Sequence, residues 1–332
     1  MTYVIRWKRL KNFFVPISSN SNIYKLDILE PLFSLFRCFI LLVSEMNVFV
    51  VAVVVSEKKE QELFSRGLFA WSATDPVHYI PTRSVDGINH PSVDFVLSKV
   101  YPEMPDDILG ALHAVSPSQH AVCLETQKVF SDRWSVIEYL WEGERTLAPD
   151  SALIGSWDDG LVDAFLIEHE NVILKTRAAF GHQETHTMCI ASSLKTVREF
   201  VNRMKGREII IQQLIPHDGW FAKVFVIGDD VSVYMRRSID THQLEDGTEV
   251  DSQRLPRGAE TIAVPDAIRL EVKQIAVEIR TLFKTDLLGF DVVLDSSCGK
   301  LIIVDVNFFP SFKELGPEFK TRLDLFCSAH SR

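Results

Sequence analysis

The sequence predicts a mixed protein in two parts, a small α/β domain followed by a larger α+β domain. A β-branched run, VFVVAVVV at 48–55, precedes an amphipathic stretch at 57–69, which is the pattern of a buried parallel strand that feeds a helix. In the second half, strands and helices lead into two long antiparallel hairpins separated by a helix. A length of 332 residues suits two domains of ordinary size.

This pattern divides the chain into three segments. We expect residues 1–45 to be an extension outside the fold, residues 46–128 to form the N-terminal α/β domain, and residues 129–332 to form the second domain with two lobes. Short extended pieces at 77–80 and 94–97 suggest further strands of the same small α/β domain.

Capping and turn residues mark the remaining elements. Helices are expected to begin near Pro105 and at Ser131, where a serine provides a suitable cap. In chain order the others are a helix at 158–169, a strand at 172–176, a helix at 195–205, a strand at 209–213, a hairpin of 221–227 with 232–236, a helix at 265–283 and a hairpin of 290–294 with 301–306.

The charge of the chain excludes several classes of protein. With 35 basic and 45 acidic residues the net charge is −10, and 46% of the residues are apolar. That composition is ordinary for a globular protein and unlike a disordered or collagen-like chain. The acidic balance argues against nucleic acid and anionic membranes as partners, because both need a broad basic surface. A small polyanion remains compatible, because a pocket needs only a few local cations.

The cysteines and the N-terminal segment bear on the cellular compartment of the protein and on its relation to membranes. Five cysteines lie far apart without a C-x-x-C pair, which indicates reduced thiols in a cytoplasmic protein. The apolar stretch at 32–55 is interrupted by Arg37 and Glu45, so we expect no stable membrane insertion. We expect a monomer.

Two hairpin strands carry a pattern that is typical of a metal site. Asp291 lies within an apolar strand, and Asp305 and Asn307 close the strand that we expect to pair with it. Side chains two apart on a strand point to the same face, so the three oxygen-bearing groups converge. Such a set suits a hard cation such as Mg²⁺. Residues that merely end strands or cap turns are the simpler alternative, but a buried, unpaired carboxylate is costly.

Cations in or beside apolar strands suggest phosphate binding. Lys175, Lys223 and Arg236 occupy such positions, where each alone would be read as an edge or solvated residue. Beside a divalent metal site they suit phosphate groups. The sequence has neither a G-x-x-x-x-G-K-[ST] loop nor a G-x-G-x-x-G motif, which excludes the P-loop and protein-kinase modes of nucleotide binding.

The histidines are less specific. His182 and His186 follow Lys175 in a loop, and His217 precedes a turn, so spacing alone suggests surface-loop histidines. No H-E-x-x-H or comparable zinc spacing is present.

These motifs, in order from Ser56 to the C-terminus, resemble the inositol-tetrakisphosphate 1-kinase family, also called inositol 1,3,4-trisphosphate 5/6-kinases. DVNFFPSFKE at 305–314 is similar to the family signature D-[IV]-N-x-F-P-x-[YF]. The segment 212–228 resembles the hinge and the substrate-lysine strand, 174–188 resembles the nucleotide lysine and its following loop, and SEKK at 56–59 resembles the first strand-to-helix turn. The resemblance implies an ATP-grasp fold with an N-terminal α/β (pre-grasp) domain.

The resemblance also implies a reaction, the transfer of the ATP γ-phosphate to a free hydroxyl of an inositol tris- or tetrakisphosphate, with Mg²⁺ as cofactor. Residue roles follow by position. Metal is assigned to Asp291, Asp305 and Asn307. ATP is assigned to Arg133, Lys175, Gln212, Gln213, Leu214, Ile215, Lys223, Ser238 and Ser252. The inositol phosphate is assigned to Lys59, Lys99, His186, Lys223, Asn307 and Ser311, and catalysis to Lys223, His186 and Asp305.

Departures from the family pattern leave alternatives open. The loop from Gly181 to His186 is one residue longer, and Thr185 replaces a serine, so His182 competes with His186 for the substrate role. Ser311 replaces a glycine that approaches the substrate. Two other functions remain compatible, an ATP-grasp carboxylate–amine ligase and a non-catalytic inositol-phosphate sensor. The preferred inositol hydroxyl stays open.

Overall fold

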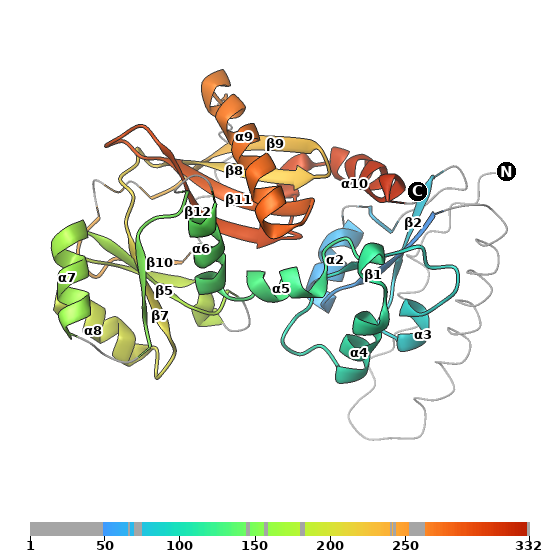
Figure 1. Cartoon of the computed structure of the whole chain (residues 1–332), viewed down its shortest axis with the longest axis horizontal. Coiled ribbons are helices and arrows are strands. Elements are labelled where there is room, and N and C mark those ends of the chain that lie inside the picture. Colours follow the sequence, from blue (N-terminus) through green and yellow to red (C-terminus); the bar gives the residue numbers. More distant parts are fainter. Residues whose placement is uncertain are drawn as a thin grey trace.

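The computed structural model describes residues 49–65, 67–69, 75–143, 147–155, 159–179, 183–239, 241, 244–251 and 263–330. The expected extension at 1–45 lies outside these residues. The described chain forms three sheets with helices around them (Figure 1). None of the helices in these ranges is long and apolar enough to cross a bilayer.

The N-terminal sheet is parallel and has the order β2-β1-β3. Its strands are β1 (Phe49–Val54), β2 (Val77–Pro81) and β3 (Phe95–Ser98), and its helices are α2 (Glu57–Ser65), α3 (Val85–Ile88), α4 (Asp106–Ala114) and α5 (Leu124–Phe130). Alternate residues of β1 serve two cores, because Val51 and Val53 face the C-terminal half while Ala52 and Val54 face α4. Burial on both faces explains the unbroken β-branched run.

The central sheet is antiparallel and has the order β10-β6-β5-β7-β4. Its strands are β4 (Ser151–Ile154), β5 (Val172–Thr176), β6 (Thr187–Ala191), β7 (Ile209–Gln213) and β10 (Glu249–Asp251), and its helices are α7 (Asp159–His169), α8 (Leu194–Arg203) and the short turn η3 (Gln183–His186). Val172 and Leu174 pack beneath α7 and α8, whereas Ile173 faces the opposite side. We call this sheet with α7 and α8 the lobe.

The C-terminal sheet is antiparallel and has the order β12-β11-β8-β9. Its strands are β8 (Trp220–Ile227), β9 (Asp230–Arg237), β11 (Leu287–Leu294) and β12 (Leu301–Phe308). The helices packed around it are α6 (Arg133–Glu142), α9 (Asp266–Phe283) and α10 (Glu318–Ala329), and the short turn η5 (Lys313–Leu315) follows β12. A second short turn, η2 (Pro117–Gln119), lies between α4 and α5 of the N-terminal part.

The N-terminal and C-terminal sheets share one hydrophobic core, which runs from β1 and β3 through α10 to β8 and β11. On the C-terminal helix α10, Phe326 meets Phe95 of β3 at 6.2 Å between ring centroids. Phe130 of α5 stacks on Phe283 of α9 and on Phe308 of β12. We call this assembly, with α6, α9 and α10, the body. The lobe has a separate core beneath α7 and α8.

Most predicted elements are confirmed, and the differences have local causes. The strands at 172–176 and 209–213 are found as predicted, and both hairpins are present with longer strands. The helix predicted from Ser131 begins at Arg133, because the Asp132 carboxylate is the cap and accepts from the Trp134 amide at 3.0 Å. Strands β4, β6 and β10 were not predicted.

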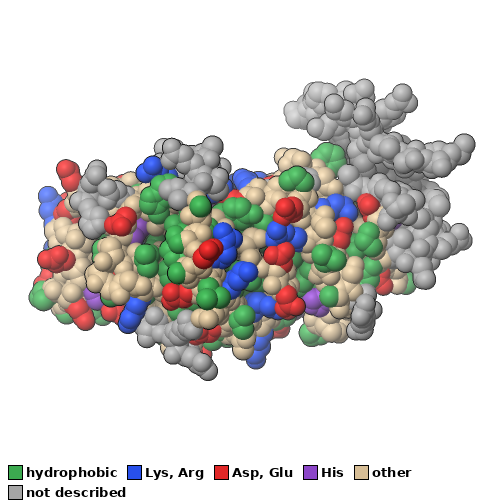
Figure 2. All heavy atoms as spheres, turned by 90° about the horizontal axis from the view of Figure 1, so that it is seen from above, with side chains coloured by type: hydrophobic (Ala, Val, Ile, Leu, Met, Phe, Trp, Pro, Cys, Tyr) green, Lys and Arg blue, Asp and Glu red, His purple; other side chains and the backbone are tan. Residues whose placement is uncertain are grey.

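The surface mixes both signs of charge. Figure 2 shows basic and acidic side chains interspersed along the face that it presents, with no continuous basic area. The chain as a whole has a net charge of −10, and this face has no basic band of the kind that binds extended polyanions.

Gly289 of β11 tests how tightly the loop after β12 is packed. A Cβ built there would lie 2.9 Å from Pro310 Cγ and 3.0 Å from the Val224 carbonyl oxygen. We expect Gly289→Ala to lower the free energy of unfolding by about 1–3 kcal/mol through this overpacking, measured by urea denaturation. Gly110→Ala on α4 is the control, because Gly110 is exposed and nothing lies within 4 Å of its built Cβ. It should stabilise by about 0.5–1 kcal/mol, and equal stability of both variants would contradict the packing.

Candidate active site

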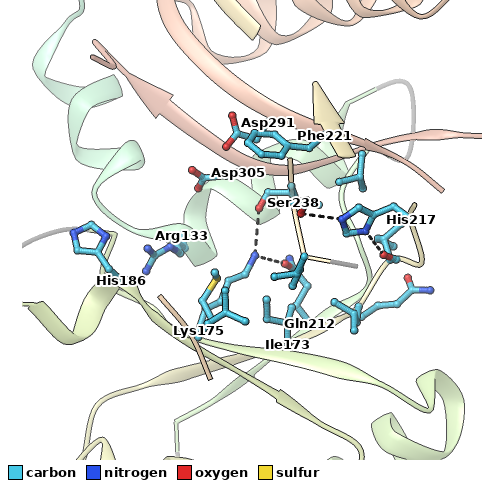
Figure 3. Close-up of a pocket in the computed structure, with 18 of the residues that line it drawn as sticks. Arg133, Ile173, Lys175, His186, Gln212, His217, Phe221, Ser238, Asp291 and Asp305 are labelled. Carbon is cyan, nitrogen blue, oxygen red and sulfur yellow. Dashed lines mark hydrogen bonds between the residues drawn. The ribbon is translucent and has the colours of Figure 1, made fainter. Parts of the chain in front are cut away.

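A cavity lies between the central sheet of the lobe and the C-terminal sheet of the body. Lys175 on β5 and Gln212 on β7 point into it from the lobe, and Asp291 and Asp305 face it from β11 and β12 (Figure 3). Arg133, at the start of α6, forms a further wall. Residues more than a hundred positions apart in the chain therefore meet at one site.

The cavity has apolar walls that suit a flat ring. Its described apolar residues come from both sheets and from the segments that follow β7 and β9, and are Ile173, Met188, Leu214, Ile215, Phe221, Ile239, Val250, Val293 and Val304. The connection between lobe and body follows Gln213, and its first residues Leu214 and Ile215 line the cavity. The predicted residues Gln212, Gln213, Leu214, Ile215 and Ser238 all line the cavity.

His217 is a wall of the cavity, so the interpretation as a surface-loop histidine is wrong. It is buried, with 6% of its surface exposed. Its Nδ1 lies 2.9 Å from the Ile215 carbonyl oxygen and its Nε2 lies 2.9 Å from the Ser238 hydroxyl (Figure 3). The ring thus ties the connecting segment to the end of β9. No sequence spacing marked this role, because Ser238 arrives through the pairing of β8 with β9.

Lys175 brings an ammonium group to the cavity. Its Nζ donates to Gln212 Oε1 at 2.7 Å and to the Val304 carbonyl oxygen at 3.3 Å. The Gln212 amide in turn donates to the Ser151 hydroxyl at 3.0 Å, which fixes its orientation. Burial lowers the pKa of Lys175 to about 8, although the carboxylate of Asp305 opposes the shift. An anion in the cavity would stabilise the charged ammonium.

The two predicted metal carboxylates lie side by side. Asp291 and Asp305 are direct partners in the pairing of β11 with β12, and a register shift follows Asp291. Burial and the neighbouring charge of Asp305 raise the pKa of Asp291 to about 6, against the opposing effect of Lys223, whose Nζ lies 3.6 Å from Asp291 Oδ1. The Asn307 amide donates to Asp305. Two adjacent carboxylates and a carboxamide oxygen fit a hard divalent cation.

The predicted substrate lysines meet at the loop that follows β12. Lys59 of α2 donates to the Pro310 carbonyl oxygen at 2.9 Å and lies over the Phe309 ring. Lys99, directly after β3, donates to the Phe308 carbonyl oxygen at 3.1 Å and lies over the Phe308 ring. Both lysines thus reach from the N-terminal part of the fold, Lys59 from α2 and Lys99 from the end of β3, to the segment that also contains Ser311. Burial lowers the pKa of Lys99 to about 8, against the opposing effect of Glu62.

The other predicted residues are placed as follows. His186 lines the cavity at the end of η3 (Figure 3). Ser252 and His182 lie outside the described residues. Lys223 lies on the same face as Asp291, its direct partner on β11. Arg236, expected to bind phosphate, forms an ion pair at 3.0 Å with Glu314. Glu314 belongs to the 305–314 motif, but nothing in its spacing marked it as a partner of Arg236.

The second half of the chain is similar to a known family of proteins. Residues 166–328 match the profile of the inositol 1,3,4-trisphosphate 5/6-kinase ATP-grasp domain. Inositol-tetrakisphosphate 1-kinase 5 of Oryza sativa subsp. japonica is 27% identical over 188 residues, which are 51% of this chain and 52% of that protein. The chain thus spans about half the length of this relative. Inositol-tetrakisphosphate 1-kinase 1 of Zea mays is 23% identical over 313 residues, 84% of this chain and 87% of that protein.

Solved structures confirm the predicted fold class. D-alanine–D-alanine ligase from Bacillus anthracis superimposes with a TM-score of 0.60 at 12% identity, over 86% of this chain and 97% of that chain. At that identity the likeness establishes the ATP-grasp fold and nothing about the substrate. Residues 166–328 are therefore an ATP-grasp domain of the inositol 1,3,4-trisphosphate 5/6-kinase family.

Proposed function

We propose that this chain is an ATP-dependent kinase that phosphorylates a free hydroxyl of an inositol tris- or tetrakisphosphate. The observation that carries the proposal is the adjacency of two charged regions. Lys175, Asp291 and Asp305 face the nucleotide cavity, and Asn307 leads directly from these carboxylates to the loop that Lys59 and Lys99 contact. A site of this form offers one end to ATP and the other to a densely charged acceptor.

At the nucleotide end, the apolar walls around Phe221 and Val293 would enclose the adenine ring. Lys175 would neutralise α- and β-phosphate oxygens, and its pairing with Gln212 holds the ammonium at that position before ATP binds. Phosphoryl transfer needs mainly positioning and electrostatic stabilisation, so fixed cations of this kind are the principal requirement.

At the centre, Asp291, Asp305 and the Asn307 carboxamide would hold Mg²⁺, which in such sites neutralises charge on the β- and γ-phosphate oxygens. Lys223 lies 3.6 Å from Asp291 and is not among the described residues that line the nucleotide cavity, so we assign it to the acceptor. Its ammonium would therefore align the acceptor hydroxyl and stabilise charge that spreads over the transferred group. His186, on the opposite wall, would contact the acceptor from the lobe.

At the acceptor end, the lysines favour a polyphosphate over an amino acid. Lys59 comes from α2 and Lys99 from the end of β3, and a carboxylate–amine ligase would have less need for two half-buried cations there. Because the lobe and the body have separate hydrophobic cores, closure of the lobe would leave these lysines and the carboxylates in place. Closure would also exclude water and limit ATP hydrolysis.

The choice of acceptor is tested by following ADP release with ATP and Mg²⁺. We expect release with inositol tris- or tetrakisphosphates and only background with D-alanine or other amino acids, because two lysines serve the acceptor end. ADP release with amino acids alone would identify a ligase. Binding of ATP without ADP release with any acceptor would identify a sensor.

Asp305→Asn tests the central carboxylate. The substitution keeps size and removes charge, so we expect turnover to fall by about a hundredfold or more while ATP still binds. Turnover comes from a coupled ADP assay, and ATP affinity from titration calorimetry. The matched control is Asp163→Asn, an exposed carboxylate on α7. Turnover of Asp305→Asn close to that of the control would refute the metal assignment.

Lys99 predicts a pH dependence. Its pKa of about 8 is depressed, so the ammonium loses its proton as the pH rises through 8. We expect kcat/KM for the inositol phosphate, at saturating ATP, to fall above that pH, because this ratio reports groups of the unliganded acceptor site. Lys99→Arg should remove the decline, since a guanidinium stays charged. A decline that persists unchanged in Lys99→Arg would exclude Lys99 as its source.

A further inference from the structure

The guanidinium of Arg133 donates to backbone carbonyl groups at the end of β5 and in the segment after it. Its Nη1 donates to the carbonyl oxygens of Thr176 at 2.9 Å and Ala178 at 2.6 Å. Its Nη2 donates to the carbonyl oxygen of Thr185 at 3.0 Å, next to His186. Arg133 thus holds both described ends of the segment that leads from Lys175 to His186, and the cavity depends on that arrangement.

Arg177, at the start of the same segment, is held between two acidic residues. Its Nε lies 3.0 Å from both carboxylate oxygens of Asp132, and its Nη2 donates to Asp132 Oδ2 at 2.7 Å. Its Nη1 donates to Glu208 Oε2 at 3.0 Å and Oε1 at 3.2 Å. One planar guanidinium therefore joins α6 of the body to the residue before β7 of the lobe.

Asp132 is rigidly oriented for this contact. Its carboxylate caps α6 by accepting from the Trp134 amide at 3.0 Å and from the Ser135 hydroxyl at 3.0 Å. Although burial opposes it, hydrogen bonds from Arg177, Ser135 and Trp134 hold the pKa of Asp132 below its usual range. The Asp132 side chain is 23% exposed and the Glu208 side chain is 45% exposed. Solvent therefore weakens the ion pair of Arg177 with Glu208 more than the ion pair of Arg177 with Asp132.

Backbone bonds connect this cluster directly to the cavity. The Arg133 amide donates to the Arg177 carbonyl oxygen at 2.9 Å, and the Arg177 amide donates to the Glu208 carbonyl oxygen at 3.0 Å. Arg177 is two residues from Lys175, whose ammonium faces the site. A shift of Arg177 would therefore move Lys175 and release the carbonyl groups that Arg133 holds.

We infer that Arg177, clamped by Asp132 and Glu208, is a positioning residue for the nucleotide phosphates. It acts through Arg133 and Lys175 and does not itself line the cavity among the described residues. The clamp lies where the lobe meets the body, so it sets the position of the lobe's phosphate-facing lysine relative to the body's carboxylates. The inference rests on the proposed function only in taking the bound nucleotide to be ATP.

The test is Arg177→Met, which keeps a long side chain and removes the charge. We expect the dissociation constant for ATP, measured by calorimetry without acceptor, to rise about tenfold, the scale of one lost charged hydrogen bond. KM for ATP should rise in parallel, while KM for the inositol phosphate stays constant. Because the binding measurement needs no acceptor, the effect of Arg177→Met on ATP affinity can be interpreted even if the chain proves not to be a kinase.

Arg198→Met is the matched control. Arg198 pairs with Asp159 at 2.6 Å between α8 and α7, so the same change is made in the same lobe away from the cavity. It should leave ATP affinity unchanged at a temperature well below the unfolding transition of every variant. The inference would be overturned if Arg177→Met and Arg198→Met bound ATP with the same affinity, whether both matched the wild type or both were weakened equally.

Two further variants keep the test decisive if Arg177→Met fails to fold. Arg177→Lys retains the charge, but an ammonium cannot form bidentate hydrogen bonds with both Asp132 and Glu208. It should therefore weaken ATP binding, but less than Arg177→Met does. Glu208→Gln should weaken it less than Arg177→Met, and the double variant Arg177→Met with Glu208→Gln should be no weaker than Arg177→Met alone. Wild-type affinity of Arg177→Lys, or independent addition of the two effects, would contradict a shared clamp.

Discussion

The site depends on the placement of two carboxylates on neighbouring strands. Asp291 and Asp305 are direct partners between β11 and β12, so their charges repel at short range in a partly buried place. Such an arrangement is stable only with compensating cations. Lys223 provides one beside Asp291 and Lys175 approaches from the opposite sheet. The rest of the structure brings these cations, and the groups that would bind phosphate, to this pair.

The division of the hydrophobic core explains how the site is assembled. The body holds the carboxylates and, through the loop after β12, Lys59 of α2 and Lys99 at the end of β3. The lobe holds Lys175 and His186 and has a core of its own. The groups that we assign to metal and acceptor are therefore fixed to one another, and Lys175, which we propose binds the nucleotide, reaches them across the boundary that Arg177 bridges.

The predictable part of this site is the part encoded locally. Asp305 and Asn307 share a face because strand side chains alternate, and Lys175 was recognised because a cation ends an apolar strand. Lys59 and Lys99 came only from the family resemblance, since nothing nearby in the chain marks them. His217 and the Arg177–Asp132 contact were missed because their partners arrive through tertiary pairing. Strand β10 is three residues long and depends on β6, so its own sequence carries no signal.

The transfer of phosphate to an inositol ring is the central claim, and the most direct measurement follows the phosphate itself. With γ-labelled ATP, Mg²⁺ and inositol 1,3,4-trisphosphate, the chain should yield a labelled inositol tetrakisphosphate in amounts equal to the ADP formed. Label that appears only as inorganic phosphate, or that stays in ATP while the nucleotide binds, would contradict a kinase acting on inositol phosphates.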